Sequence, residues 1–203
     1  PETGQGSHGY TSSYGWLEED FGSTYYDFDS MGDGSEVSDA TSLLLYHAGV
    51  SINMGYGPDV SVAQYFDAYN SMQDYFFYKN DMDEIFDYQY SDEEWKEILI
   101  NELESFRPIY YWGNEPGENV GHAWNIDGYD GDYFHNNWGW GGSQNCYFLL
   151  SSLNGFDYNQ GALIHMEPQS LDNPNVVLQD YNYEEFTGDG DSVANPGEII
   201  DLY

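Results

Sequence analysis

The sequence predicts an α+β fold in which helices come first and a meander of antiparallel strands follows. Apolar residues recur at helical spacing in residues 37–48 and again in residues 91–105. From Pro108 onward the pattern changes to short strand-like runs, separated by loops rich in Gly, Asn, Asp and Pro. This order indicates a helical lobe followed by a sheet lobe, because a parallel sheet would require strands and helices to alternate.

Two helices are expected early in the chain. The first covers residues 37–48, buries one apolar stripe, and is followed by an extended segment at residues 50–54. The second covers residues 58–70, with Asp59 as its N-cap. Residues 71–90 alternate aromatic and acidic side chains, which is typical of strands or of a packed surface loop.

A third helix is expected over residues 91–105. Ser91 and Glu94 have the spacing of a capping box, and Pro108 limits the helix at its far end. Five strands should follow, at residues 108–112, 120–127, 133–137, 145–150 and 162–167.

The stretch from Gly121 to Gly142 has the local signature of a β-hairpin, because two aromatic-rich segments flank a turn rich in Gly and Asp. A turn centred between residues 129 and 130 places His122 directly opposite Asn137. Opposed residues share one face of a sheet, with Cβ atoms about 5 Å apart. An imidazole held by a side-chain amide keeps one fixed tautomer, and its other nitrogen can face a thiol.

The run Asn137-Trp138-Gly139-Trp140-Gly141-Gly142, after Gly121-His122-Ala123, resembles the streptopain family of secreted bacterial cysteine peptidases. Weaker matches in the same order are residues 4–8, 49–58 and 107–111, so that the resemblance covers about the first four-fifths of the chain. It implies a papain-like fold with a substrate cleft between a helical lobe and a sheet lobe. It also implies export from the cell and action on protein or peptide substrates.

The same resemblance implies roles for individual residues. His122 becomes the general base, Asn137 orients its imidazole, and Trp138 covers their hydrogen bond. The substrate-binding candidates are Gly121, Tyr56 and Trp140, although Trp140 also suits packing beneath the site. The competing interpretation is that His122 is a buried hairpin histidine whose ring bonds to a backbone carbonyl.

The nucleophile is the main departure from the family pattern. The family's Cys lies on a helix that precedes the loop matched here by residues 4–8. The one cysteine, Cys146, follows the histidine and is expected to be a small buried apolar residue. The thiol is therefore expected from a Cys-bearing N-terminal chain or segment of the same precursor, and this chain alone is expected to be inactive.

The composition is strongly acidic, with 37 acidic and 3 basic residues and a formal charge of −34. Such a surface repels nucleic acid and anionic membranes, and it suits a saline, extracellular environment or the cell surface. Aromatic residues make up 19% of the chain, which supplies a core and argues against disorder. No apolar run is long enough to span a bilayer.

After Pro168 the composition becomes polar, so residues 1–168 are expected to form the catalytic domain. Residues 169–203 resemble a linker and the start of an immunoglobulin-like β module, whose terminal strand could mediate self-association. Calcium is the one cofactor considered, with four ligand candidates whose spacing departs from the EF-hand pattern: Asp189, Asp191, Asn195 and Glu198. A simple Asp/Gly turn is the alternative.

Two other functions compete with the peptidase. One is a non-catalytic structural or self-assembling extracellular protein that retains the fold. The other is a metal site formed by His122, His135 and Cys146, which no His-Glu-x-x-His or paired-Cys spacing supports.

Overall fold

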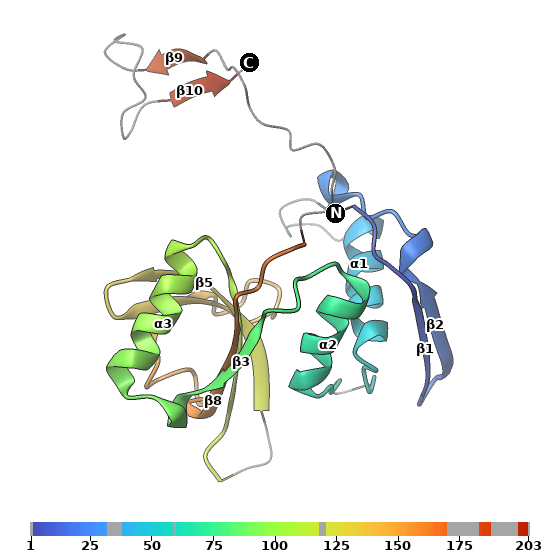
Figure 1. The fold of residues 1–203 in the computed structure, drawn as a ribbon, viewed down its shortest axis with the longest axis horizontal. Helices are drawn as coiled ribbons and strands as arrows, with labels where there is room; N and C mark the ends of the chain where they lie inside the picture. The colour runs from blue at the N-terminus through green and yellow to red at the C-terminus, as the bar shows by residue number, and fades with distance from the viewer. Residues whose placement is uncertain are drawn as a thin grey trace. The chain divides into compact units, whose positions relative to one another are not determined.

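The second half of the chain contains a six-stranded antiparallel sheet with the order β3-β8-β4-β5-β6-β7. Figure 1 labels β3, β5 and β8 of this sheet. In the computed structural model the described residues are 2–31, 38–58, 60–117, 121–169, 183–187 and 199–202. The sheet strands are β3 (Asp83–Phe86), β4 (Ile109–Asn114), β5 (Gly121–Asp130), β6 (Tyr133–Asn137), β7 (Cys146–Leu149) and β8 (Tyr158–Ile164). A helical part followed by an antiparallel sheet confirms the α+β class.

The helical part precedes the sheet. Its first elements are the hairpin of β1 (Ser7–Ser12) and β2 (Gly15–Asp20). Helix α1 (Asp39–Ser51) contacts both this hairpin and α2 (Tyr65–Tyr75), as Figure 1 shows. Short 3₁₀ turns complete the part, at η1 (Phe21–Ser23), η2 (Phe28–Ser30) and, before the third helix, η3 (Asp87–Gln89).

Helix α3 (Asp92–Glu104) packs against β4 and β5. Its predicted capping box is present, since Ser91 Oγ accepts the Glu94 N–H and Glu94 accepts the Ser91 N–H at 2.9 Å. The buried face of α3 carries Trp95 and Leu99, and the indole N–H of Trp95 donates to the Tyr111 hydroxyl at 3.0 Å. This core holds the sheet that bears His122.

The helix boundaries differ from the expectation at two places. The segment 50–54 was expected to be extended, but α1 continues through Ser51 because Val50 and Ser51 are buried on the helix. Helix α2 begins only at Tyr65 and has Gln64 as its N-cap, so the prediction that this helix starts with Asp59 as its N-cap is wrong. Asp59 itself lies outside the described residues. A proline and an acidic residue are therefore insufficient to start this helix.

All three basic side chains form ion pairs. Lys79 pairs with Glu167, and Arg107 bonds to Glu102 at 2.7 Å and to Glu167 at 3.3 Å. Lys96 lies 2.8 Å from Asp132. Burial alone would raise the pKa of Glu102, but hydrogen bonds from Arg107 and from the His165 N–H hold it below its ordinary value.

The chain divides into two units, residues 1–169 and residues 170–203. In the second unit, β9 (Tyr183–Thr187) pairs antiparallel with β10 (Ile199–Leu202). The immunoglobulin-like assignment and the self-association of this region stay predictions. The four calcium candidates, Asp189, Asp191, Asn195 and Glu198, lie outside the described residues, and calcium binding there also stays a prediction.

Candidate active site

The hairpin of β5 and β6 turns at a different place from the one expected. Its closing pair is Asp130 with Tyr133, and Gly131 supplies the positive φ of +60° that the tight turn needs. An irregularity between Ile126 and Gly128 then shifts the register. Asn137 pairs with Asn125 as a result, so the predicted pairing of Asn137 with His122 is wrong.

The imidazole of His122 bonds instead to a backbone carbonyl. Its Nε2 lies 2.8 Å from the Trp138 carbonyl oxygen. A carbonyl oxygen can only accept, so Nε2 carries the proton and Nδ1 keeps its lone pair in the neutral ring. The carbonyl thus fixes the tautomer, which is the task that the Asn137 amide was expected to perform. This contact also fits a purely structural histidine, so the surroundings of the ring must decide its role.

Aromatic rings surround His122. Trp140 stacks on the imidazole with ring centroids 4.9 Å apart, and Trp138 and Trp124 lie at 6.2 and 6.0 Å. Phe156 contributes a tilted contact at 5.5 Å. Trp138 is fully buried, and its predicted role as a cover over a hydrogen bond between His122 and Asn137 stays a prediction. Exclusion of water strengthens the hydrogen bond between His122 and the Trp138 carbonyl.

His122 also lines a cavity of about 340 Å³ in which helical and sheet residues meet. One wall is the segment that leads into α2, and the other consists of β4 and the start of β5. The lining residues are Val62, Ala63, Gln64, Tyr65, Tyr110, Trp112, Gly113, Asn114, Gly121, His122 and Ala123. A histidine with one fixed nitrogen, at the edge of a cavity lined by both apolar and polar residues, has the arrangement of a general base beside a substrate site.

The three substrate-binding candidates lie in different places. Gly121 lines the cavity beside His122. Trp140 is 38% exposed and contacts the imidazole face, so it is near the site without lining the cavity. Tyr56 lies elsewhere: it packs against Gly49 of α1, and Ser13 Oγ donates to its carbonyl at 3.0 Å. The cavity lining does not include Tyr56, whose part in substrate binding stays a prediction.

Cys146 is exposed, so its expected burial is wrong. It begins β7, which is an edge strand of the sheet and therefore has a solvent-facing side. Its backbone pairs with that of Asn136 in β6. His135, the other member of the proposed metal site, bonds through Nδ1 to Asp127 at 2.5 Å. Within the described ranges, no group of three or more His, Cys, Asp or Glu residues could hold a metal ion.

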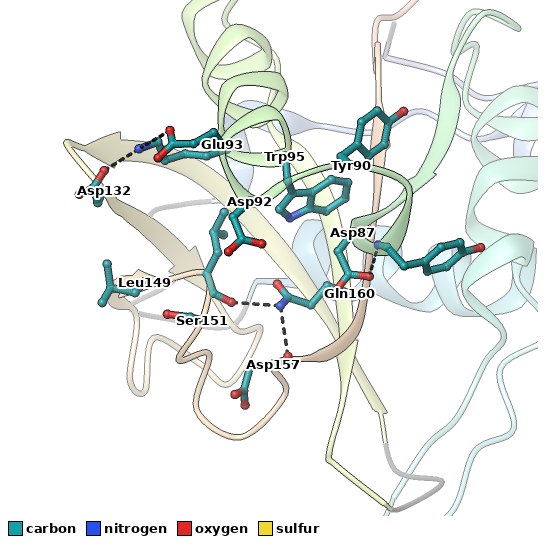
Figure 2. A pocket seen from close by; sticks show the side chains of 13 residues that line it. Asp87, Tyr90, Asp92, Glu93, Trp95, Asp132, Leu149, Ser151, Asp157 and Gln160 are labelled. Atoms are coloured by element: carbon teal, nitrogen blue, oxygen red, sulfur yellow. Dashed lines mark hydrogen bonds and ion pairs between the residues drawn. The ribbon is translucent and has the colours of Figure 1, made fainter.

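A second, larger cavity of about 600 Å³ lies beside the N-terminal end of α3 (Figure 2). Carboxylates dominate its rim, as Figure 2 shows for Asp87, Asp92, Glu93, Asp132 and Asp157. Trp95 and Gln160 form part of its wall. Its lining contains neither histidine nor cysteine, so it lacks both groups of a thiol peptidase. The smaller cavity at His122 is therefore the candidate active site.

Sequence reasoning did not identify several residues at the site. Phe156 reaches His122 from the loop before β8, and Tyr65 and Trp112 stack in the cavity wall with ring centroids 4.7 Å apart. Asn145 accepts the Trp138 N–H at 3.1 Å. The aromatic pattern of residues 108–112 could have indicated Trp112. The other contacts join segments far apart in the chain or depend on a loop conformation, and neither has a local signal.

Comparisons with known proteins show which family the chain resembles in sequence. The family model described as the peptidase C10 family matches residues 1–148. Streptopain of Streptococcus pyogenes is 33% identical over 141 residues, which cover 64% of this chain and 35% of streptopain. The thiol protease/hemagglutinin PrtT of Porphyromonas gingivalis is 39% identical over 97 residues, covering 42% of this chain and 11% of PrtT. The chain thus spans about a third of the length of the streptopains that it matches.

A solved structure extends the similarity to the fold. Active wild-type interpain A, a cysteine protease of Prevotella intermedia, matches with a TM-score of 0.71 and 33% sequence identity. The match covers 80% of this chain and 75% of the interpain A chain. The family model covers more than half of the present sequence, and the fold match agrees with it. The chain belongs to the peptidase C10 family, the streptopain family of papain-like cysteine peptidases.

Proposed function

We propose that this chain supplies the histidine half of a secreted cysteine endopeptidase, and that residues outside this sequence supply the nucleophilic thiol. The observation that carries the proposal is the position of His122. Its Nε2 bonds to the Trp138 carbonyl, and the residue lines the cavity where helical and sheet residues meet. Cys146 follows the histidine on an exposed edge strand and suits the role of nucleophile poorly.

In the proposed reaction, Nδ1 of His122 takes the proton of the incoming thiol, and the thiolate attacks the carbonyl carbon of the scissile peptide bond. The imidazolium then returns this proton to the departing amine, which leaves a thioester on the sulfur. A water molecule, deprotonated by the same imidazole, attacks the thioester and releases the acid. The Trp138 carbonyl holds the ring in one orientation through all of these steps.

The substrate is proposed to be an extended peptide that passes between the two cavity walls. The aromatic wall of Tyr65 and Trp112 suits an apolar peptide side chain, and Gly121 leaves room for a backbone. The formal charge of −34 favours neutral or cationic peptides over acidic ones. The same charge supports action outside the cell. None of the helices in the described ranges is long and apolar enough to cross a membrane.

The test combines an epoxide-type inhibitor of thiol peptidases with denaturing electrophoresis and intact-mass analysis of the natural protein. The expected result is a label on a cysteine outside these 203 residues, in material that also contains this chain. His122→Ala should prevent the labelling, and His135→Ala is the matched control. If the material contains only this chain and nothing is labelled, the peptidase proposal fails and a non-catalytic structural or self-assembling protein replaces it.

A further inference from the structure

The peptide group between Trp138 and Gly139 is fixed from several sides. Its carbonyl oxygen accepts the His122 Nε2–H at 2.8 Å, and its N–H, which belongs to Gly139, donates to Asn137 Oδ1 at 3.2 Å. The preceding N–H, that of Trp138, donates to Asn145 Oδ1 at 3.1 Å. Two asparagine side chains thus hold the short segment that presents the carbonyl to the imidazole.

Asn145 lies where the ladder between β6 and β7 ends. The last backbone pair is Asn136 with Cys146, and beyond it the chain leaves the sheet through a loop with three glycines at positive φ. The Trp138 N–H therefore has no strand carbonyl opposite it. The Asn145 amide oxygen takes the place of that carbonyl, because a buried backbone N–H must find an acceptor.

We propose that Asn145 is a positioning residue for His122 that acts through the backbone of Trp138. The inference rests on the proposed function, because it assigns Asn145 to the same site. Asn145 fixes the Trp138 N–H, which restrains the rotation of Trp138 and so the direction of its carbonyl. That carbonyl fixes the imidazole. Asn145 touches neither substrate nor thiol in this scheme.

The physical basis is the coupling between successive hydrogen bonds. The Trp138 N–H and the Trp138 carbonyl belong to adjacent peptide groups, so a bond that fixes the N–H limits the backbone rotation at Trp138 that would redirect the carbonyl. Trp138 is fully buried, so few water molecules can replace a lost acceptor there. Loss of the Asn145 oxygen should loosen the Trp138 backbone first and the His122 bond second. A residue that only stabilises the loop would affect the first bond without the second.

The experiment measures the exchange of the His122 Nε2 proton with water by ¹⁵N-resolved NMR on this chain. Asn145→Ala should speed this exchange about tenfold, the size expected for the loss of one supporting hydrogen bond. Asn145→Asp keeps an acceptor oxygen at the same distance from the backbone and should restore slow exchange. Gln144→Asn changes a neighbouring exposed amide in the same loop and should leave the exchange unchanged.

The proposal is overturned if Asn145→Ala speeds exchange of the Trp138 amide but leaves the His122 proton as in the unmodified chain. It is also overturned if Asn145→Asp fails to restore slow exchange. If Asn145→Ala does not fold, Asn145→Ser replaces it with the same expected and contradicting results, because its side chain is too short to reach Trp138. The measurement needs no thiol, so it can succeed or fail independently of the inhibitor labelling that tests the peptidase function.

Discussion

His122 and His47 are both histidines held by hydrogen bonds in aromatic surroundings, but they differ in how many ring nitrogens are used. His47 is only 2% exposed, its Nδ1 lies 3.0 Å from the Tyr26 hydroxyl, and its Nε2 lies 3.1 Å from the Glu19 carboxylate. For His122 the described residues provide one hydrogen bond, through Nε2, and the residue lines a cavity. A general base needs a nitrogen that can receive a proton, and of these two histidines only His122 offers one.

The comparison also separates two uses of the same side chain. At His47 both nitrogens join elements that are distant in sequence, since Glu19 is in β2, Tyr26 precedes η2, and His47 itself is in α1. The imidazole there connects the helical part of the molecule. At His122 the bonded nitrogen serves to orient the other one. Four predictions test whether this division into a structural and a catalytic histidine is correct.

The largest effect is expected for His122→Ala in the complete peptidase. Removal of the base should lower kcat about 10²- to 10⁴-fold, because proton transfer contributes that much to catalysis. The free energy of unfolding should fall less than for His47→Ala, because one ring nitrogen and not two loses a hydrogen bond and the residue borders a cavity. Steady-state kinetics and denaturant unfolding measure the two quantities. A variant that kept its activity would remove His122 from the mechanism.

His47→Ala should lower the stability of the fold and leave the inhibitor labelling intact. It leaves the Glu19 carboxylate and the Tyr26 hydroxyl with one partner fewer and opens a buried space, so unfolding should become easier by about 2–4 kcal/mol. Inhibitor labelling of the folded material should persist. Urea titration of this chain is the measurement, with His8→Ala as a control on the neighbouring hairpin. An unchanged urea midpoint would contradict the structural role of His47.

The stability of the chain at alkaline pH tests the hydrogen bonds of His47 with Tyr26 and Glu19. Burial, followed by the charge of Glu19, raises the pKa of Tyr26 from 10.0 to about 12. A tyrosine whose pKa rises on folding adds stability that is complete below its unfolded value and is lost as pH rises through the folded value. The stability gap between the unmodified chain and Tyr26→Phe should therefore shrink by about 2 kcal/mol between pH 9 and 12. A constant gap over this range would contradict the burial of that hydroxyl.

The smallest effect is expected for Gly139→Ala. This substitution should affect the site of His122 and not the surroundings of His47. Gly139 has a φ of +73°, and no heavy atom lies within 4 Å of the position that a Cβ would occupy. The cost should therefore be backbone strain alone, about 1 kcal/mol. The strained peptide is the one that holds His122, so slower inhibitor labelling should accompany the lower melting temperature. The pH dependence of stability that is assigned to Tyr26 should stay the same in this variant. A change in that pH dependence would contradict the division into a structural and a catalytic histidine.

The sequence predicted correctly those structural elements that depend on contacts between residues close together in the chain. The Ser91–Glu94 capping box, the bounds of β6 and the hairpin that carries His122 could be predicted because neighbours in sequence determine them. The register could not. One irregularity at residue 127 and a turn two residues later than expected place Asn125, and not His122, opposite Asn137.

The carbonyl of Trp138 illustrates a second limit of sequence reasoning. Every residue has a backbone carbonyl, so the sequence gives no sign of which one will face an imidazole. The side-chain amide of Asn137 was the visible candidate, yet in the structure it bonds to the Gly139 N–H. The exposure of Cys146 was missed for a related reason, because the sequence does not reveal that β7 is an edge strand.

The number and the location of the three basic residues determine where other proteases could cleave the folded chain. Trypsin-like proteases cut only after Lys or Arg and need an accessible, extended segment. Lys96 lies within helix α3, Arg107 precedes a proline, and Lys79 is engaged with Glu167. The folded chain therefore offers trypsin almost no cleavable bond over 203 residues. Peptide mapping of this protein should rely on enzymes that cut at acidic or aromatic residues.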